Sequence, residues 1–224
     1  VTILILTETQ LKKKQMSNIN LHLGDCLEAM KQMDDNQFDL AIVDPPYGLS
    51  YESRVFKDGK KWDEHIPPKK YFDELMRVSK NQIIWGGNFF LDYLGATKSM
   101  IVWDKKDTAR NGLWKCELAW CSNEKGSYIF RNKQIGKRGF YVVECERIHP
   151  TQKPVKLYEW ILDNYANEGD KILDTHLGSG SIALACHNRK FYLDGWEIDE
   201  EYYKNALKRL DTHKSQLTIF DLGV

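Results

Sequence analysis

Apolar residues along the chain fall into short runs separated by segments with helical spacing. The short apolar or alternating runs predict strands at residues 19–23, 38–43, 82–85, 100–103, 117–121, 171–174 and 191–197. The 3.6-residue period of an amphipathic helix appears at residues 69–78, 157–165, 179–187 and 200–210. Buried apolar strands that alternate with helices are typical of a mainly parallel sheet with helices on both faces, so the sequence predicts an α/β fold.

We expect the chain to form one folded domain, flanked by an N-terminal extension and a C-terminal tail. Its 224 residues are enough to bury a sizeable core. Patterned sequence starts near Met16, so we expect residues 1–15 to be a weakly structured N-terminal extension. Residues 16–214 are then the folded domain and residues 215–224 a C-terminal tail. Residues 48–68 are polar with little periodicity, which predicts a long loop, and loops of that length are often functional.

Composition narrows the class of protein without deciding it. Hydrophobic residues make up 42% and charged residues 29% of the chain, which is ordinary for a globular protein. No apolar run approaches the roughly 20 residues that span a bilayer. Five cysteines with no C-x-x-C pair suggest reduced thiols in a cytoplasm. The formal net charge is zero, which taken as a total argues against a nucleic-acid partner.

A glycine-rich turn follows the predicted strand at 171–174 and opens a helix. It reads Asp174-Thr-His-Leu-Gly178-Ser-Gly180. Glycines let a ligand approach the backbone closely, and the free N–H groups of a helix N-terminus favour a carboxylate or a phosphate. Glu197 ends the next strand, where a carboxylate accepts hydrogen bonds from ribose hydroxyls. Together these features predict a site for a cofactor that contains a nucleoside.

Two cofactors fit that turn. Residues 178–183 match the G-x-G-x-x-A pattern of dinucleotide-binding proteins, which leaves a dinucleotide-dependent oxidoreductase as an alternative. Only 44 residues follow Gly180, too few for the second half of a dinucleotide domain. The carboxylate of Asp174 also suits a cation, such as the amino end of S-adenosylmethionine, better than it suits a pyrophosphate.

The strand at 38–43 ends in Asp44-Pro45-Pro46-Tyr47. Two prolines make the turn rigid and supply no N–H, so its carbonyl groups are available as acceptors. Asp44 adds a second acceptor and Tyr47 a flat face for stacking. Two acceptors beside an aromatic plane suit a planar amine, such as the exocyclic NH2 of a base flipped out of the double helix.

The order of these motifs resembles the β-type (permuted) amino-group DNA methyltransferases, in which the D-P-P-Y motif precedes the cofactor motif. His149-Pro-Thr-Gln-Lys153-Pro, Gly24-Asp25 and Gly195-Trp-Glu197 also match. The chain departs from the family at Thr175-His176, where the family has Pro-Phe. The resemblance implies a Rossmann-like S-adenosylmethionine-dependent methyltransferase sheet with circularly permuted motif order. It also implies an inserted target-recognition region at about residues 106–148.

The resemblance implies transfer of a methyl group from S-adenosylmethionine to the N6 amine of a flipped adenine in DNA. Cytosine-N4 methylation and a non-catalytic DNA-binding homologue remain alternatives. By resemblance, the catalytic residues are Asp44, Pro45, Pro46 and Tyr47. The cofactor-binding residues are Asp25, Lys153, Asp174, His176, Leu177, Gly178, Ser179, Gly180 and Glu197. Within this set, Lys153 is expected near the methionine carboxylate and Asp25 near the adenine.

Charge is unevenly distributed along the neutral chain. Residues 98–156 hold 13 Lys and Arg against 6 Asp and Glu, while both flanks are acidic. Basic side chains with interleaved aromatic residues are typical of a nucleic-acid surface. The predicted partner is therefore double-stranded DNA, with contacts expected from Arg54, Lys105, Lys106, Arg110, Lys115, Arg131, Lys133, Lys137 and Arg138.

Weaker signals concern metals and partners. The cysteines and the histidine at 116, 121, 145 and 149 have spacing reminiscent of zinc ligands, but their positions in strands and in a motif argue for no metal site. Residues 216–220, Gln-Leu-Thr-Ile-Phe, resemble the short peptide with which bacterial proteins dock on the sliding clamp. A homodimer, a role in restriction-modification and a bacterial or phage-infected cytoplasm complete the expectations.

Overall fold

The computed structural model describes residues 18–49, 63–105, 115–131 and 148–221, with side chains up to residue 216. Within these residues eight strands form one sheet. The strands are β1 (Ile19–Leu23), β2 (Phe38–Val43), β3 (Ser79–Trp85), β4 (Ser99–Asp104), β5 (Cys116–Cys121), β6 (Tyr128–Arg131), β7 (Lys171–Asp174) and β8 (Tyr192–Glu197). The helices are α2 (Cys26–Met30), α3 (Lys69–Val78), η1 (Gly87–Phe89), α4 (Leu91–Leu94), α5 (Val155–Tyr165), α6 (Ser181–Arg189) and α7 (Glu200–Asp221).

The order of strands across the sheet is β1-β8-β7-β2-β3-β5-β4-β6. The first five of these run parallel. The strand β5 runs antiparallel to both of its neighbours, β3 and β4, and the edge strand β6 runs parallel to β4. The prediction of a mainly parallel α/β sheet is thus confirmed, with an antiparallel addition at one side.

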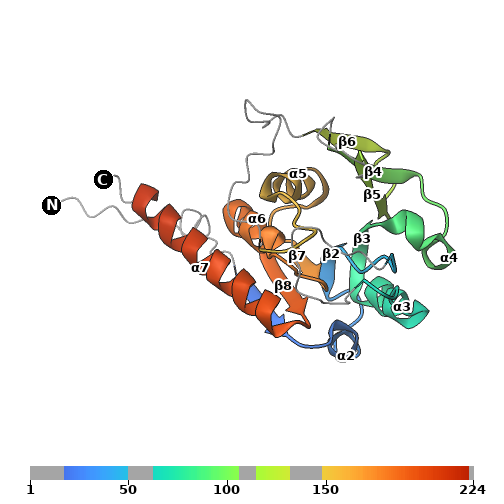
Figure 1. Ribbon diagram of the computed structural model, residues 1–224. Coiled ribbons are helices and arrows are strands. Elements are labelled where there is room, and N and C mark those ends of the chain that lie inside the picture. Colours follow the sequence, from blue (N-terminus) through green and yellow to red (C-terminus); the bar gives the residue numbers. More distant parts are fainter. Residues whose placement is uncertain (1–17, 50–62, 106–114, 132–147, 222–224) are drawn as a thin grey trace.

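Helices cover the sheet on both faces (Figure 1). The side chains along β2 alternate between the two apolar clusters that these helices form with the sheet. Leu40 and Ile42 belong to the apolar cluster that contains residues of α5, α6 and α7. Ala41 and Val43 point to the opposite face, into the cluster built with α2 and α3. Because both faces of the strand are buried, its sequence is continuously apolar rather than alternating.

A topological switch point lies between the adjacent strands β7 and β2. From β7 the chain passes through α6 on one face to β8, while from β2 it passes through α3 on the other face to β3. The two connections therefore leave the carboxyl ends of β7 and β2 in opposite directions and open a crevice there. Ligands of open α/β sheets bind at such points.

The antiparallel strand β5 brings a different part of the chain to the same edge of the sheet. Since β5 opposes β3, its first residues lie where β3 ends, and residue 85 pairs with residue 119. The strand β4 opposes β5 in turn, so its last residue, Asp104, pairs with Cys116. Lys105 and Glu117 thereby lie at the edge that carries the switch point.

The element boundaries differ from prediction where hydrophobic patterning is weak. The strand β6 was not predicted because it is short and two of its apolar residues, Tyr128 and Ile129, are 49% and 52% exposed. The helix α7 runs to residue 221 rather than 210; its second half extends past the sheet (Figure 1), and residues 211–216 are exposed or half-buried. Residues 215–221, predicted as part of a separate tail, belong to this helix. Residues 1–15, most of the predicted loop at 48–68 and most of the 106–148 region lie outside the described residues.

Candidate active site

The Asp-Pro-Pro-Tyr turn leaves β2 at the switch point and is held by side chains on both sides. The Tyr47 hydroxyl donates to Oδ1 of Asp44 at 2.5 Å. The backbone N–H groups of Tyr47 and Gly48 both donate to Oδ1 of the buried Asp63, at 2.6 and 3.2 Å. Asp63 was missed by sequence analysis because it lies in an aperiodic polar segment. Its contacts fix the turn that presents the Asp44 carboxylate.

The ring of Tyr47 lies against a backbone that only glycine allows. A Cβ atom at Gly86 would lie 2.2 Å from the Tyr47 ring, and Gly86 has a positive φ of +66°. The ring stacks on Phe89 with centroids 5.2 Å apart. Beside it lies a cavity of about 130 Å³, lined by Tyr47, Gly86, Asn88, Phe89, Cys116, Glu117 and Leu118. An aromatic wall and a neighbouring carboxylate are the features expected of a pocket for a planar base.

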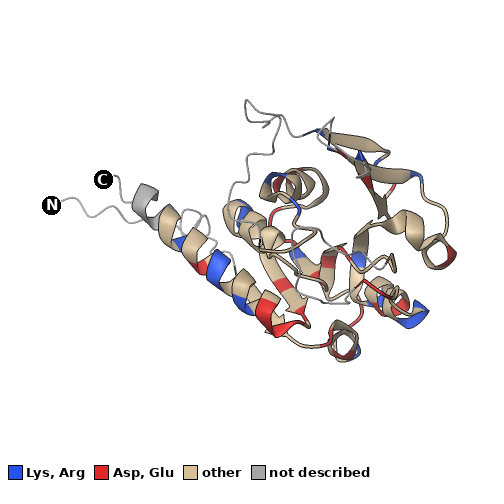
Figure 2. Cartoon of the chain, in the orientation of Figure 1, with Lys and Arg blue, Asp and Glu red and all other residues tan. Residues whose placement is uncertain are grey.

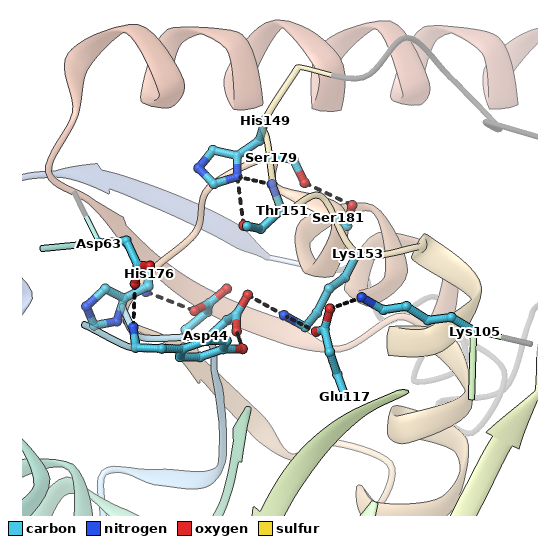
Figure 3. A network of polar contacts seen from close by, with 12 residues as sticks. Asp44, Asp63, Lys105, Glu117, His149, Thr151, Lys153, His176, Ser179 and Ser181 are labelled. Carbon is cyan, nitrogen blue, oxygen red and sulfur yellow. Dashed lines mark hydrogen bonds and ion pairs between the residues drawn. The ribbon is translucent and has the colours of Figure 1, made fainter. Parts of the chain in front are cut away.

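An ion-pair network joins Asp44 to the antiparallel strands (Figure 3). The Lys153 ammonium contacts Oδ2 of Asp44 and lies 3.2 Å from Oε2 of Glu117. Lys105 contacts the other oxygen of Glu117. Burial opposes the charge of Lys153, but Asp44 and Glu117 outweigh it and hold the Lys153 pKa above its usual value. Burial likewise opposes the charge of Glu117, and the two ammonium groups hold that pKa below its usual value.

The predicted cofactor turn joins β7 to α6 in a conformation that its glycines make possible. Gly178 and Gly180 have φ of +50° and +69°. The N–H of Gly178 donates to Oε2 of Glu197 at 2.8 Å, and the N–H of Asp199 donates to Oε1 at 2.9 Å. Glu197 therefore bridges the ends of β7 and β8, and burial raises its pKa.

Asp174 is the last residue of β7 and is almost fully buried. Its Oδ1 accepts the N–H of His176 at 3.0 Å, and among the described residues no Lys or Arg lies within ion-pair distance of it. Burial, together with the nearby carboxylates of Asp44 and Glu197, raises the Asp174 pKa to about 8. A buried carboxyl group in these surroundings favours a cationic ligand.

The departure at Thr175-His176 produces a chain of hydrogen bonds. The Tyr71 hydroxyl on α3 lies 2.6 Å from Oγ1 of Thr175, which lies 2.9 Å from Nδ1 of His176. Burial lowers the His176 pKa to about 4, so the ring is neutral near pH 7. A neutral ring supplies an apolar face in place of phenylalanine, and the hydrogen bonds fix its position.

The motif at 149–154 braces the glycine turn from the other side. The His149 ring lies 3.6 Å from where a Cβ of Gly178 would be, and it packs edge-on against Tyr202 of α7. Its Nδ1 lies 3.2 Å from the Thr151 hydroxyl. Leu177 is buried and donates its N–H to the carbonyl oxygen of Trp196 at 2.9 Å. These contacts hold the turn between the motif, β8 and α7.

Asp25, which the sequence predicts to bind the cofactor, caps the helix α2. Its Oδ1 accepts the N–H groups of Leu27 and Glu28 at 2.7 and 3.4 Å, so it caps the helix α2. Gly24 just before it donates its N–H to the carbonyl oxygen of Glu197 at 2.8 Å. Asp25 is thereby placed at the end of β1, beside the end of β8.

Only three of the predicted DNA contacts fall on described residues. Lys115 is exposed, and the guanidinium of Arg131 donates to Oδ2 of Asp104 at 2.8 Å. Lys105 belongs to the network with Glu117. Basic and acidic positions are interspersed along the described helices and strands (Figure 2). Outside the described residues lie Arg54, Lys106, Arg110, Lys133, Lys137 and Arg138.

The described residues contain neither a metal-binding cluster nor a membrane-spanning helix. Across the part of the chain that the structure describes, no group of three or more His, Cys, Asp or Glu side chains is arranged to hold a metal ion. Over the same residues, no helix combines the length and apolar character needed to cross a membrane.

Comparisons with known proteins agree with the geometry. A family profile described as "DNA methylase" matches residues 84–208, and one described as "N-6 DNA Methylase" matches residues 3–77. The first match covers more than half of the chain, so the chain belongs to the DNA methylase family. It is therefore a DNA methyltransferase of the adenine-N6 or cytosine-N4 class rather than an oxidoreductase.

Individual relatives have low sequence identity to this chain but align with most of its length. The Type II methyltransferase M.HpaI of Haemophilus parainfluenzae is 24% identical over 84% of this chain and 73% of its own. The crystal structure of the M1.HpyAVI-SAM complex is 25% identical, with a TM-score of 0.57, over 86% of this chain and all of that one. The PvuII DNA methyltransferase, described as cytosine-N4-specific, has a TM-score of 0.56 at 15% identity over 86% of each chain and shows the fold alone.

Proposed function

We propose that this DNA methyltransferase methylates the N6 amine of an adenine flipped into the pocket beside Tyr47. The observation that carries the proposal is the position of Asp44 and Asp174 at the ends of the adjacent strands β2 and β7. The Asp44 carboxylate accepts a hydrogen bond from the target amine, and the Asp174 carboxylate binds the ammonium group of the cofactor. Adenine is favoured because Asp begins the Asp-Pro-Pro-Tyr motif, and the segment with this motif matches the N-6 DNA Methylase profile.

The residues present fit S-adenosylmethionine as the cofactor. Asp174 lies buried with no Lys or Arg at ion-pair distance among the described residues and suits the cofactor's ammonium group. Each oxygen of Glu197 accepts one backbone N–H and keeps a second lone pair for a ribose hydroxyl. Lys153 has three N–H donors, so its contacts with Asp44 and Glu117 leave capacity for the methionine carboxylate.

The residues of the Asp-Pro-Pro-Tyr turn prepare the amine. Asp44 and the carbonyl of Pro45 accept its two N–H groups, which draws the nitrogen lone pair out of conjugation with the ring. Pro46 keeps the turn rigid and Tyr47 stacks on the base. When bound, S-adenosylmethionine would supply an electrophilic methyl group on its sulfonium sulfur and would leave as the neutral thioether, while the methylated amine would lose one proton. Asp44 stabilises the positive charge that develops on the nitrogen, a preorganised electrostatic effect.

Product analysis tests the proposal directly. Unmethylated bacterial DNA is incubated with the full chain and labelled S-adenosylmethionine, digested to nucleosides and examined by mass spectrometry. We expect labelled N6-methyladenine. Label found only in N4-methylcytosine would show that the pocket selects the other base, and absence of label from DNA would refute the proposed activity.

The variant Asp44→Ala separates chemistry from cofactor binding. We expect loss of methyl transfer by at least about 100-fold, because the acceptor for the amine is removed. Calorimetry should give a cofactor Kd within about threefold of the native value, since Asp44 lies outside the glycine turn. Retained methyl transfer would contradict the role of Asp44 in binding the amine. Loss of cofactor binding would show that Asp44 acts on S-adenosylmethionine instead.

A further inference from the structure

The network beside Asp44 has one member that no sequence motif indicates. Glu117 on β5 lies between the ammonium groups of Lys153 and Lys105, and its side chain is 15% exposed. It also lines the cavity beside Tyr47. Glu117 therefore touches both the pocket proposed for the base and the lysine that contacts Asp44.

The buried charge of Lys153 bears on the proposed reaction. The Lys153 side chain is 3% exposed and contacts Oδ2 of Asp44, the carboxylate that serves the amine. The amine nitrogen gains positive charge as the new nitrogen–carbon bond forms. An uncompensated ammonium group so close to Asp44 would oppose that charge, and it would do so strongly because little water screens the site.

We propose that Glu117 is a positioning residue that holds Lys153 on Oδ2 of Asp44 and neutralises its charge, leaving Oδ1 to the target amine. The inference rests on the proposed function. Oδ1 accepts the hydroxyl of Tyr47, and a carboxylate oxygen has a second lone pair for the amine. By occupying Oδ2, Lys153 leaves Oδ1 of Asp44 to bind the amine. Glu117 neutralises the Lys153 ammonium, so that this positive charge does not oppose the positive charge of the transition state.

The surrounding groups keep the network neutral. Two ammonium groups face two carboxylates, so the formal charges cancel. The Lys153 ammonium also lies 5.2 Å from the ring centroid of Trp85. Burial raises the pKa values of Tyr47 and Tyr158 well above normal, so both hydroxyls stay neutral. Asp174 is the other carboxyl group close enough to influence Lys153.

The variant Glu117→Gln tests the charge while keeping the shape of the side chain. We expect the single-turnover rate constant for methyl transfer, at saturating DNA and cofactor, to fall at least about tenfold. The Kd for S-adenosylmethionine, measured by calorimetry, should stay within about threefold. The matched control is Glu124→Gln, which removes an exposed carboxylate paired with Lys98 on the surface. Its rate constant should equal that of the native protein.

A second substitution distinguishes charge from structure. Adding Lys105→Met to Glu117→Gln removes the excess positive charge, so we expect the rate constant to recover at least about threefold from the single variant. A purely structural role for Glu117 predicts a further loss instead, and that result would overturn the proposal. If Glu117→Gln does not fold, Glu117→Asp replaces it: the charge is kept, so retained transfer supports the proposal and loss of transfer overturns it.

Failure of this inference differs from failure of the proposed function. A native protein that methylates DNA, together with an unchanged rate constant in folded Glu117→Gln, would overturn the role of Glu117 alone. A native protein that transfers no methyl group to DNA would refute the proposed function itself.

Discussion

Gly86 limits the target pocket through a contact with Tyr47. Replacing it with Ala puts a Cβ 2.2 Å from the Tyr47 ring, so the ring must shift and its hydroxyl contact with Asp44 is disturbed. We expect Gly86→Ala to lower methyl transfer at least about tenfold with little change in cofactor affinity. Gly95→Ala is the control for backbone strain: Gly95 has φ +70° and ψ −172°, a conformation that strains Ala at least as much, but it has open space around its Cβ position. Equal activity losses in the two variants would show that backbone strain, not the ring contact, is responsible.

Asp174 makes folding stability depend on pH. Its pKa is about 8 in the folded protein, against an ordinary value of 3.8, mainly because the group is buried. Between these values the folded protein binds a proton that the unfolded chain releases, so the free energy of unfolding falls as pH rises through this window.

The variant Asp174→Asn removes that dependence. We expect its Tm to exceed the native Tm by several degrees at pH 8 and by much less at pH 5, measured by scanning calorimetry. The same variant should lose cofactor affinity, because the acceptor for the cofactor's ammonium group is gone. A Tm difference that does not change with pH would contradict the raised pKa.

The positions of the motif residues at the sheet edge were predictable from sequence, but the side chains that contact them were not. Asp44, Asp174 and Glu197 lie at the carboxyl ends of strands, so their meeting at one edge of the sheet followed from the parallel topology. Glu117 and Asp63 lie in segments whose place depends on an antiparallel strand and on an aperiodic loop. Their contacts with Lys153 and Tyr47 depend on tertiary packing that the local pattern does not encode.

At the scale of elements, the helix α7 supports the cofactor turn. The Arg209 guanidinium donates to the carbonyl oxygen of Ser179 at 2.8 Å and to Oγ of Ser181 at 2.9 Å. Both acceptors belong to the turn and the start of α6. The helix therefore contributes to the site by supporting the backbone of the turn.

We expect Arg209→Ala to raise the Kd for S-adenosylmethionine about tenfold, since hydrogen bonds from a charged group to the turn are lost. Lys208→Ala changes the exposed neighbouring side chain and should leave the Kd unchanged. Calorimetry on both variants checks this. An unchanged Kd in Arg209→Ala would show that the turn holds its shape without α7.

Elements with a strong apolar pattern were predicted with nearly correct bounds. The strands β1, β2 and β7 and the helix α3 match their predicted residues. The elements β6, η1 and α4 were missed because they are short, and their few apolar residues show no period. The extent of α7 was underestimated because residues 211–216 are exposed or half-buried and contain no apolar residue to continue the helical pattern.

At the scale of the whole molecule, uneven charge predicts how the protein meets DNA. The neutral total conceals an excess of seven positive charges in residues 98–156. We expect replacing Lys133, Lys137 and Arg138 with Gln to reduce the slope of log affinity against log salt by about 3. Replacing Lys204, Lys208 and Lys214 of α7 is the charge-matched control and should leave the slope unchanged. Fluorescence anisotropy with a labelled duplex measures both, and equal slopes would place the DNA contacts elsewhere.

The pairing of β2 with β7 has a consequence for how the protein is made. The two strands are neighbours in the sheet, yet about 130 residues of chain separate them. During synthesis on the ribosome, β2 can pair early with β3 but has no partner on its other side until β7 emerges. An apolar strand with an open edge invites wrong pairing, so the nascent chain is vulnerable to aggregation or to chaperone capture over that interval. Because the two ligand sites flank this late pairing, neither is complete until β7 has emerged and paired with β2.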